Sequence, residues 1–290
     1  MILGKFTIVK RVFSGTVTSD GAGVKLTRYI GQPGHEYFDP FLLLDFINSE
    51  DRDDYISGFP AHPHRGFETV TYLFAGRLYH KDNTGHSSTL EAGGVQWMTA
   101  GRGIVHSEMP EQCEGKLSGI QLWVNLPRAV KMCKPKYSEF TSSKMPEEER
   151  EGDVIVRVIA GRSSLGTCGP IQGIATNPIF FDTKLPQGGR LLEPIEENMG
   201  AFLFIINGNI IVRDDTREIP LRIKSNQLVT LDPGEMLDIT AGNDGARMLL
   251  IAAKRLDEPI TRHGPFVMTT TEEIQQAIDD YNSGGFGHLD

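Results

Sequence analysis

Short runs of β-branched and aromatic residues, each closed by glycine or proline, recur along most of this chain. Phe67–Phe74 stops at Ala75-Gly76, Ile120–Leu126 alternates before Pro127, and Val154–Ile159 follows the same style. Runs of this length and spacing are typical of β-sandwiches and β-barrels. The 32 glycines and 16 prolines among 290 residues fit a chain with many tight turns. The sequence therefore predicts an all-β fold.

Two distant stretches of the chain resemble each other. Leu90–Gly101 aligns with Leu231–Gly242, and Tyr72–Leu78 resembles Phe204–Ile210 at a slightly different offset, so one copy carries an insertion. The alternative is that any two β-hairpins look alike. A repeat predicts two similar β domains. The polar stretch Ser138–Asp153, with its run of charges, is most simply a solvated connection between them. We therefore expect one domain over residues 1–138 and a second over 139–290.

One helix is well signalled near the end of the chain. Thr270 and Glu273 have the spacing of a capping box. The residues that follow form one apolar helical face at positions i, i+3, i+4 and i+7: Ile274, Ala277, Ile278 and Tyr281. Gly284-Gly285 is a stop signal. We expect a short C-terminal packing helix over Glu272–Tyr281.

The chain is acidic, with 29 Lys and Arg against 38 Asp and Glu, a net charge of −9 and a pI of about 5.4. Such a balance does not favour direct binding to nucleic acid or anionic lipid. No apolar run approaches the ~18 residues of a membrane span, and the first residues lack the pattern of a signal peptide. The cysteines, Cys113, Cys133 and Cys168, are too scattered for a disulfide framework and fit a reducing compartment. We expect a cytoplasmic protein, nuclear as well in a eukaryote.

Five of the eight histidines lie between positions 62 and 106. In His62-Pro63-His64, two imidazoles at i and i+2 of an extended chain point to the same side. His106-Ser107-Glu108 repeats this spacing with one imidazole and one carboxylate. Histidine pairs of this kind often make only hydrogen bonds, but two such pairs and Glu68 together favour a metal site. Three nitrogens and one oxygen suit Fe(II), Mn(II), Ni(II) or Cu(II) better than a closed structural zinc site.

The other histidines are expected to play smaller parts. His80 and His86 sit beside turn residues, so we interpret them as surface groups or as groups that support the ligands from outside. His35, His263 and His288 have no companions and receive no role.

These histidine and glutamate motifs, with the residues around them, resemble those of the pirin family of the cupin superfamily. Gly58, His62, His64, Glu68 and Gly76 resemble the first cupin motif, although the glycine spacings are not standard, and Gly103 with His106 resembles the core of the second. The stretches that look like pirin are Gly58–Val70, Gln96–Pro110, Asp39–Leu43, Gln121–Leu126 and His263–Met268. The likeness is looser between about 140 and 255.

The resemblance implies a bicupin, in which two cupin-type β-barrels pack together and only the N-terminal barrel holds a metal. Carried over by motif, the ligands are His62, His64, His106 and Glu108, usually around iron; Mn, Ni, Cu and Zn are the other candidates. In ordinary cupins the carboxylate ligand is the glutamate of the first motif, here Glu68. Glu108 shares a strand face with His106, whereas a bulge at Arg65-Gly66 would turn Glu68 away.

The resemblance also implies two kinds of function. One is dioxygenase activity, in which O2 opens flavonols such as quercetin, with Glu108 as ligand and as the base that accepts the substrate hydroxyl proton. Phe59 and Trp97 are candidate apolar walls for a flat substrate, although core packing is the more common role for such residues. The other is an iron-binding, redox-sensitive module that binds proteins and acts as a transcriptional co-regulator. A third reading is a metal-binding module whose activity on flavonols is incidental.

The repeat itself predicts a single metal site per chain. Where the first copy has His106 and Glu108, the second has Arg247 and Leu249. The positions near those that match His62 and His64 are Pro194 and Glu196. A copy without imidazoles and with an arginine in their place is not expected to bind a cation.

Overall fold

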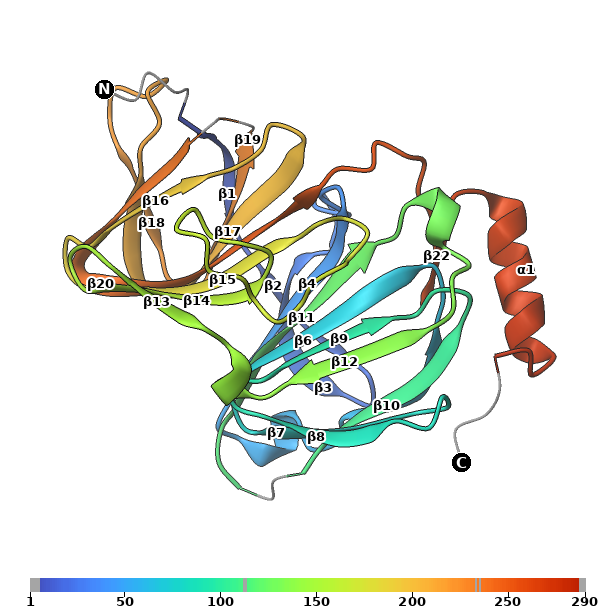
Figure 1. The fold of residues 1–290 in the computed structure, drawn as a ribbon. Coiled ribbons are helices and arrows are strands. Elements are labelled where there is room, and N and C mark those ends of the chain that lie inside the picture. Colours follow the sequence, from blue (N-terminus) through green and yellow to red (C-terminus); the bar gives the residue numbers. More distant parts are fainter. Residues whose placement is uncertain (1–5, 112–113, 233, 235, 287–290) are drawn as a thin grey trace. The chain divides into compact units, whose positions relative to one another are not determined.

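The computed structural model describes residues 6–111, 114–232, 234 and 236–286, so Cys113 and His288 lie outside the described residues. The chain divides into two compact units that are both built almost entirely of strands (Figure 1). We call Thr16–Ser142 with Leu256–Asp290 the first barrel, and Met1–Gly15 with Ser143–Arg255 the second barrel. The predicted all-β class with two barrels and a short C-terminal helix is confirmed.

The first barrel has a seven-stranded sheet in the order β12-β9-β6-β11-β4-β3-β2, a four-stranded sheet in the order β5-β10-β7-β8, and the pair β21-β22. Short 3-10 turns cover Arg52–Asp54 and Arg128–Val130. The strands are β2 (Thr16–Asp20), β3 (Val24–Ile30), β4 (Phe41–Ser49), β5 (Phe59–His64), β6 (Phe67–Ala75), β7 (Arg77–Asp82), β8 (Ser87–Glu91), β9 (Val95–Thr99), β10 (Ile104–Pro110), β11 (Leu117–Asn125), β12 (Lys136–Phe140), β21 (Thr261–His263) and β22 (Phe266–Met268).

The second barrel is one nine-stranded sheet, in which β1-β19-β17-β20-β15-β14-β13 form the main path and β16 and β18 pair with β20 and β17. An apolar cluster fills the core of this barrel and draws on most of its strands, with Phe181, Leu203 and Leu250 among its members. Its strands are β1 (Ile8–Ser14), β13 (Glu147–Arg150), β14 (Val154–Ala160), β15 (Ile179–Leu185), β16 (Arg190–Pro194), β17 (Met199–Val212), β18 (Leu221–Lys224), β19 (Gln227–Asp232) and β20 (Met236–Lys254).

The two ends of the chain correct the predicted domains. Strand β1 pairs antiparallel with β19, so the first residues belong with the second barrel and not with a domain over 1–138. The segment from Leu256 onward belongs to the first barrel and not to a domain over 139–290. The physical reason is strand pairing: each terminal segment bonds to strands that are distant in sequence, and a boundary drawn at one linker cannot show this.

The charge run Glu147–Glu151 is a second correction, because most of it is strand and not a solvated connection. β13 pairs with β14, and Glu148 is buried. Its carboxylate accepts hydrogen bonds from Ser163 at 2.5 Å and from Arg150 at 2.6 Å. A 3-10 turn at Ser142–Lys144 precedes it. Glu148 and Arg150 are therefore partnered within the second barrel.

The helix α1 (Thr271–Asn282) forms where the sequence predicted it. Thr270 and Glu273 make the capping box, and Ile274 and Ala277 are buried. They join a small core with Val105, Phe266 and Met268, so the helix packs beside strand β10 of the first barrel. Gly66, which follows β5, has a positive φ of 89°, and a Cβ there would collide with the Val267 carbonyl. Glycine thus lets the C-terminal segment approach closely. No helix in the described residues is long and apolar enough to cross a membrane.

Candidate metal centre

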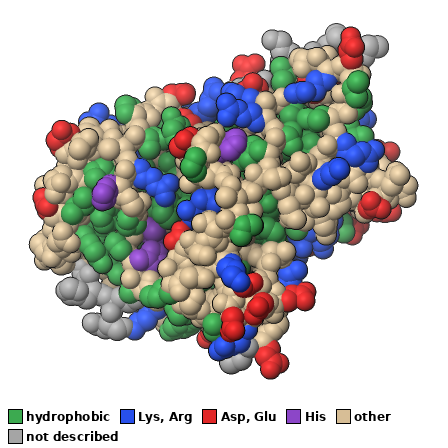
Figure 2. Space-filling model, turned by 180° about the vertical axis from the view of Figure 1, so that it is seen from behind, with side chains coloured by type: hydrophobic (Ala, Val, Ile, Leu, Met, Phe, Trp, Pro, Cys, Tyr) green, Lys and Arg blue, Asp and Glu red, His purple; other side chains and the backbone are tan. Residues whose placement is uncertain are grey.

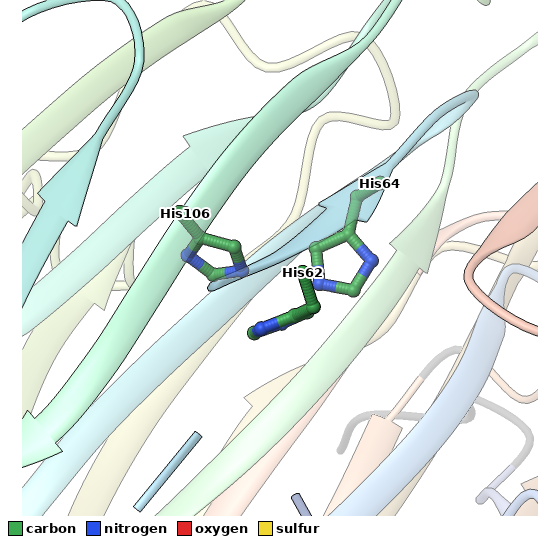
Figure 3. Close-up of side chains that lie close together, drawn as sticks. All are labelled: His62, His64 and His106. Atoms are coloured by element: carbon green, nitrogen blue, oxygen red, sulfur yellow. The ribbon is translucent and has the colours of Figure 1, made fainter. Parts of the chain in front are cut away.

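Strands β5 and β10 bring three histidines together. His62 and His64 lie on one face of β5, and the register of the two strands sets His106 directly opposite His62. One ring nitrogen from each of the three lies within 4.8 Å of the others, and the ring centroids are 4.4 to 5.0 Å apart. Figure 3 shows the three imidazoles converging from the two strands. The His-x-His spacing therefore works as the sequence indicated.

The hydrogen bonding of these imidazoles leaves nitrogens for an ion. His64 Nδ1 and both nitrogens of His106 are buried without a hydrogen-bond partner in the described chain. His62 Nδ1 donates to the Pro60 carbonyl at 2.8 Å, which leaves Nε2 available. Burying unpaired polar atoms costs about 1–3 kcal/mol each. Coordination of a metal would remove that cost, so the residues present fit a metal ion.

The protonation of the buried pair also suits a metal. Burial, together with the neighbouring imidazole of His62, lowers the pKa of His64 well below its usual value. Burial and the three surrounding histidines do the same to the pKa of His106. Both rings are therefore neutral near pH 7, which is the form that binds metals.

Glu108, the fourth predicted ligand, lies next to His106 on β10 beyond a bulge. Its carboxylate is buried and belongs with His106 and His80 to a second group of close ligand atoms. The Thr71 hydroxyl donates to Oε1 at 2.8 Å, and the Gln121 amide donates to Oε2 at 3.4 Å. The two groups share His106, and the structure holds Glu108 at the edge of the histidine cluster.

Glu68 is directed elsewhere. Its Oε1 accepts from the Thr99 hydroxyl at 2.7 Å, and it belongs to neither group of candidate ligands in the described residues. Burial raises the pKa of Glu68 to about 7, against the opposing effect of the hydrogen bond from Thr99. In the structure, this carboxylate is hydrogen-bonded to a residue of strand β9.

Of the two interpretations of His80, a surface position is excluded by the structure, and a group that supports the ligands from outside fits it. His80 is fully buried on β7, where Gln96 donates to its Nδ1 at 2.7 Å and its Nε2 donates to Asp82 at 3.0 Å. Both nitrogens are thus engaged, so His80 supports the centre through packing 5.4 Å from the His106 ring. The alternation of Leu78, His80 and Asp82 is the signal that could have placed it inside. His86 is exposed, as expected.

A cavity of about 550 Å³ opens beside the cluster, within the first barrel. His62, His64 and Glu108 line it. Phe59 lines it as expected, whereas Trp97 is buried in the sheet and Trp123 takes the second aromatic position. This volume is in the usual range for small-molecule sites. On the face drawn in Figure 2, histidine side chains appear beside hydrophobic ones.

Comparisons with known proteins agree with this architecture. The Pirin family profile matches residues 23–124, and the profile of the Pirin C-terminal cupin domain matches residues 180–287. The chain is 48% identical over 278 residues to a pirin-like protein of Caulobacter vibrioides, which covers 96% of this chain and 98% of that one. It is 45% identical over 283 residues to a Pseudomonas aeruginosa protein provisionally named as a quercetin 2,3-dioxygenase, which covers 97% and 98%.

Among solved structures, the quercetin 2,3-dioxygenase of Acinetobacter baumannii superposes with a TM-score of 0.86 at 30% identity, covering 98% of this chain and 100% of that one. Near-complete coverage in both directions means that the likeness extends over both barrels. The sequence resemblance is thereby confirmed, and the chain belongs to the pirin family, with two cupin domains.

Proposed function

We propose that this protein is a metal-dependent dioxygenase of the pirin type, which opens flavonols such as quercetin with O2. Fe(II) is the proposed metal, one ion per chain, with His62, His64, His106 and Glu108 as its ligands. The similarity to proteins named for quercetin 2,3-dioxygenase activity supports the reaction. The donor set of three imidazoles and a carboxylate supports the metal.

One observation carries the proposal: imidazoles with ring nitrogens left available to an ion lie at the wall of a cavity that is large enough for a small aromatic ligand. His62 and His64 reach the cavity of about 550 Å³, and His106 stands behind them. Phe59 and Trp123 provide flat apolar surfaces on the same cavity. A planar substrate would gain most of its binding energy from such walls, while a few polar groups fix its orientation.

A residue of the chain accepts the proton that the flavonol 3-hydroxyl loses. When bound, iron would act as a Lewis acid that lowers the pKa of the flavonol 3-hydroxyl and would bring the substrate together with O2. Glu108 lines the cavity, and its carboxylate is the group placed to accept that proton. Thr71 and Gln121 hold the carboxylate by hydrogen bonds and so fix its direction.

Oxygen uptake tests the proposal. The protein is loaded with Fe(II) without air, its metal content is measured, and quercetin is added with O2. We expect O2 consumption together with loss of flavonol absorbance. The double variant His62→Ala/His64→Ala should lose both, and His86→Ala, which removes an exposed histidine outside the cluster, should keep both. Turnover no faster than that of free iron would count against the proposal.

The second hypothesis, an iron-binding, redox-sensitive co-regulator, stays a prediction. It requires that a protein partner binds with an affinity that depends on the oxidation state of the iron. That result, combined with no turnover of flavonols above free iron, would favour it over the dioxygenase.

A further inference from the structure

The cavity of the first barrel has one basic side chain in its described lining, and it comes from the far end of the sequence. Arg262 lies on β21 and lines the cavity that His62 and His64 also line. Its guanidinium carbon is 4.8 Å from the centroid of the Trp123 ring. The Trp123 ring in turn is 5.1 Å from the His64 ring. Trp123 therefore links the cation to the histidine cluster along one wall.

No carboxylate contacts Arg262 directly in the described residues, although Asp20 and Asp45 act on its charge from farther away. Asp20 and Asp45 line the same cavity, but both are bonded to Arg28, at 2.6 Å for Asp20 and at 2.6 and 2.8 Å for Asp45. Within the described residues Arg262 forms no ion pair and donates only to the carbonyls of Leu42 and Gly264, at 3.4 and 3.3 Å. A guanidinium carries five N–H donors and is always charged. Most of its donors are therefore available to a ligand.

Hydrogen bonds from Lys131 and Arg65 fix the position of the hairpin that carries Arg262. Lys131 is buried and donates to the carbonyls of Gly66 and Val267 at 2.7 and 3.0 Å, which ties the β21-β22 hairpin to the residue after β5. The backbone of Arg65 bonds to Pro265 and Val267 as well. The guanidinium also lies over the Trp123 ring at cation–π distance, and this contact helps to hold it in place. A fixed, unpaired cation in a partly apolar cavity is a recognition element for an acceptor.

We propose that Arg262 is a specificity-determining residue, which binds an oxygen acceptor on the end of a planar aromatic ligand remote from the metal ligands. The choice of a flavonol as that ligand rests on the proposed function. A ligand with hydroxyl or phenolate groups on its outer ring satisfies the guanidinium. A ligand with a bare outer ring displaces water from the guanidinium without replacing its hydrogen bonds, and so binds less well.

Two flavonols separate this role from general packing. Quercetin carries hydroxyls on its outer rings, and 3-hydroxyflavone has the same 3-hydroxyl and 4-carbonyl but bare outer rings. Their dissociation constants are measured by tryptophan fluorescence quenching, without air, with metal-loaded wild type, Arg262→Gln and the control Arg52→Gln. Arg52 is half exposed and does not line the cavity. Metal content and circular dichroism verify that each variant is folded and loaded.

We expect Arg262→Gln to weaken quercetin binding about tenfold or more, the usual loss for a hydrogen bond to a charged group. Binding of 3-hydroxyflavone should change less than twofold, and Arg52→Gln should change neither. Equal losses for both ligands, or no loss for either, would overturn the assignment. If wild type binds neither flavonol, the proposed function fails and the assignment falls with it, whereas binding of both without the selective loss refutes the role of Arg262 alone.

Discussion

Glu108 and Glu68 are two buried carboxylates of the same barrel with different surroundings. Glu108 lies beside His106, whereas Glu68 bonds Thr99 on strand β9. We expect Glu108→Ala to weaken metal affinity by at least about 10–100-fold, because it removes a proposed ligand and the loss of even a supporting group has a cost of this size. Glu68→Ala should change it only a few fold. Competition with a chromophoric chelator measures both, and the reverse order would restore the ordinary cupin assignment.

The pKa of Glu68 predicts a pH dependence of stability. It is about 7 in the folded protein against 4.5 for an ordinary glutamate, so between these values the folded state keeps a proton that the unfolded state releases. Raising the pH through this window therefore destabilises the wild type relative to Glu68→Gln, by roughly 3 kcal/mol at most, since one pKa unit corresponds to about 1.36 kcal/mol.

Urea unfolding of the metal-free proteins from pH 4 to pH 8 measures this difference. The difference between Glu68→Gln and wild type should grow up to about pH 7 and then level off. The exposed Glu91→Gln is the control and should follow the wild type at every pH. Parallel curves for Glu68→Gln and wild type would contradict the prediction.

At the scale of single residues, the sequence predicted the arrangement of side chains within one strand but not the arrangement that depends on the pairing of two strands. The spacing in His62-Pro63-His64 suffices to put both imidazoles on one side of β5. The repeated spacing in His106-Ser107-Glu108 suggested that this pair joins His62 and His64, but the register that sets His106 opposite His62 could not be derived from it. Trp123 and Arg262 were missed because strands without a shared motif bring them to the cavity.

Among the elements, α1 connects the end of the chain to the candidate centre. Ile274 packs with Val105, the neighbour of His106, and Arg65 pairs with Asp280 at 2.7 Å. Ile274→Ala should cost about 2–5 kcal/mol, the range for such core truncations, and lower the Tm by several degrees. Truncation after Thr270 should lower it further, because all these contacts are lost.

Differential scanning calorimetry measures both effects. Gln275→Ala, one position along on the exposed face of the helix, is the matched control and should leave the Tm nearly unchanged. An unchanged Tm after truncation would show that the helix contributes nothing to the stability of the first barrel.

Elements with strong local signals were predictable, and elements stabilised by their neighbours were not. The capping box and the apolar face gave α1 to within a residue at each end. Strand β13 was missed, because Glu147–Arg150 has no apolar alternation; pairing with β14 and the ion pairs of Glu148 hold it. Local propensity carries little information where tertiary partners decide the structure.

For the whole molecule, we expect one metal ion per chain, in the first barrel. Both groups of candidate ligands in the described residues lie there. In the second barrel, Arg247 forms a two-point pair with Asp182 at 2.6 and 3.0 Å, and Leu249 is part of the buried interior. Elemental analysis should give one equivalent for wild type and none for His106→Ala. A value close to two would contradict this prediction.

The division of the molecule was predictable only in part. The repeat indicated two similar domains, because each copy begins at the end of one strand and continues into the following strand. The barrel to which each end of the chain belongs was not predictable. β1 pairs with β19, and the final segment forms a bridge to the residue after β5. Pairings at such sequence separation leave no local trace in the residues.

The position of β21, β22 and α1 after the second barrel in the chain has a consequence for biosynthesis. A ribosome releases the strands that carry His62, His64 and His106 early, but it releases Arg262, Pro265 and α1 last. While translation continues, the nascent first barrel lacks one wall of its cavity and the helix that packs on Val105. Its structure can be completed only after the whole second barrel and then α1 have been synthesised. Loading of the finished site is therefore expected to follow synthesis of the second barrel.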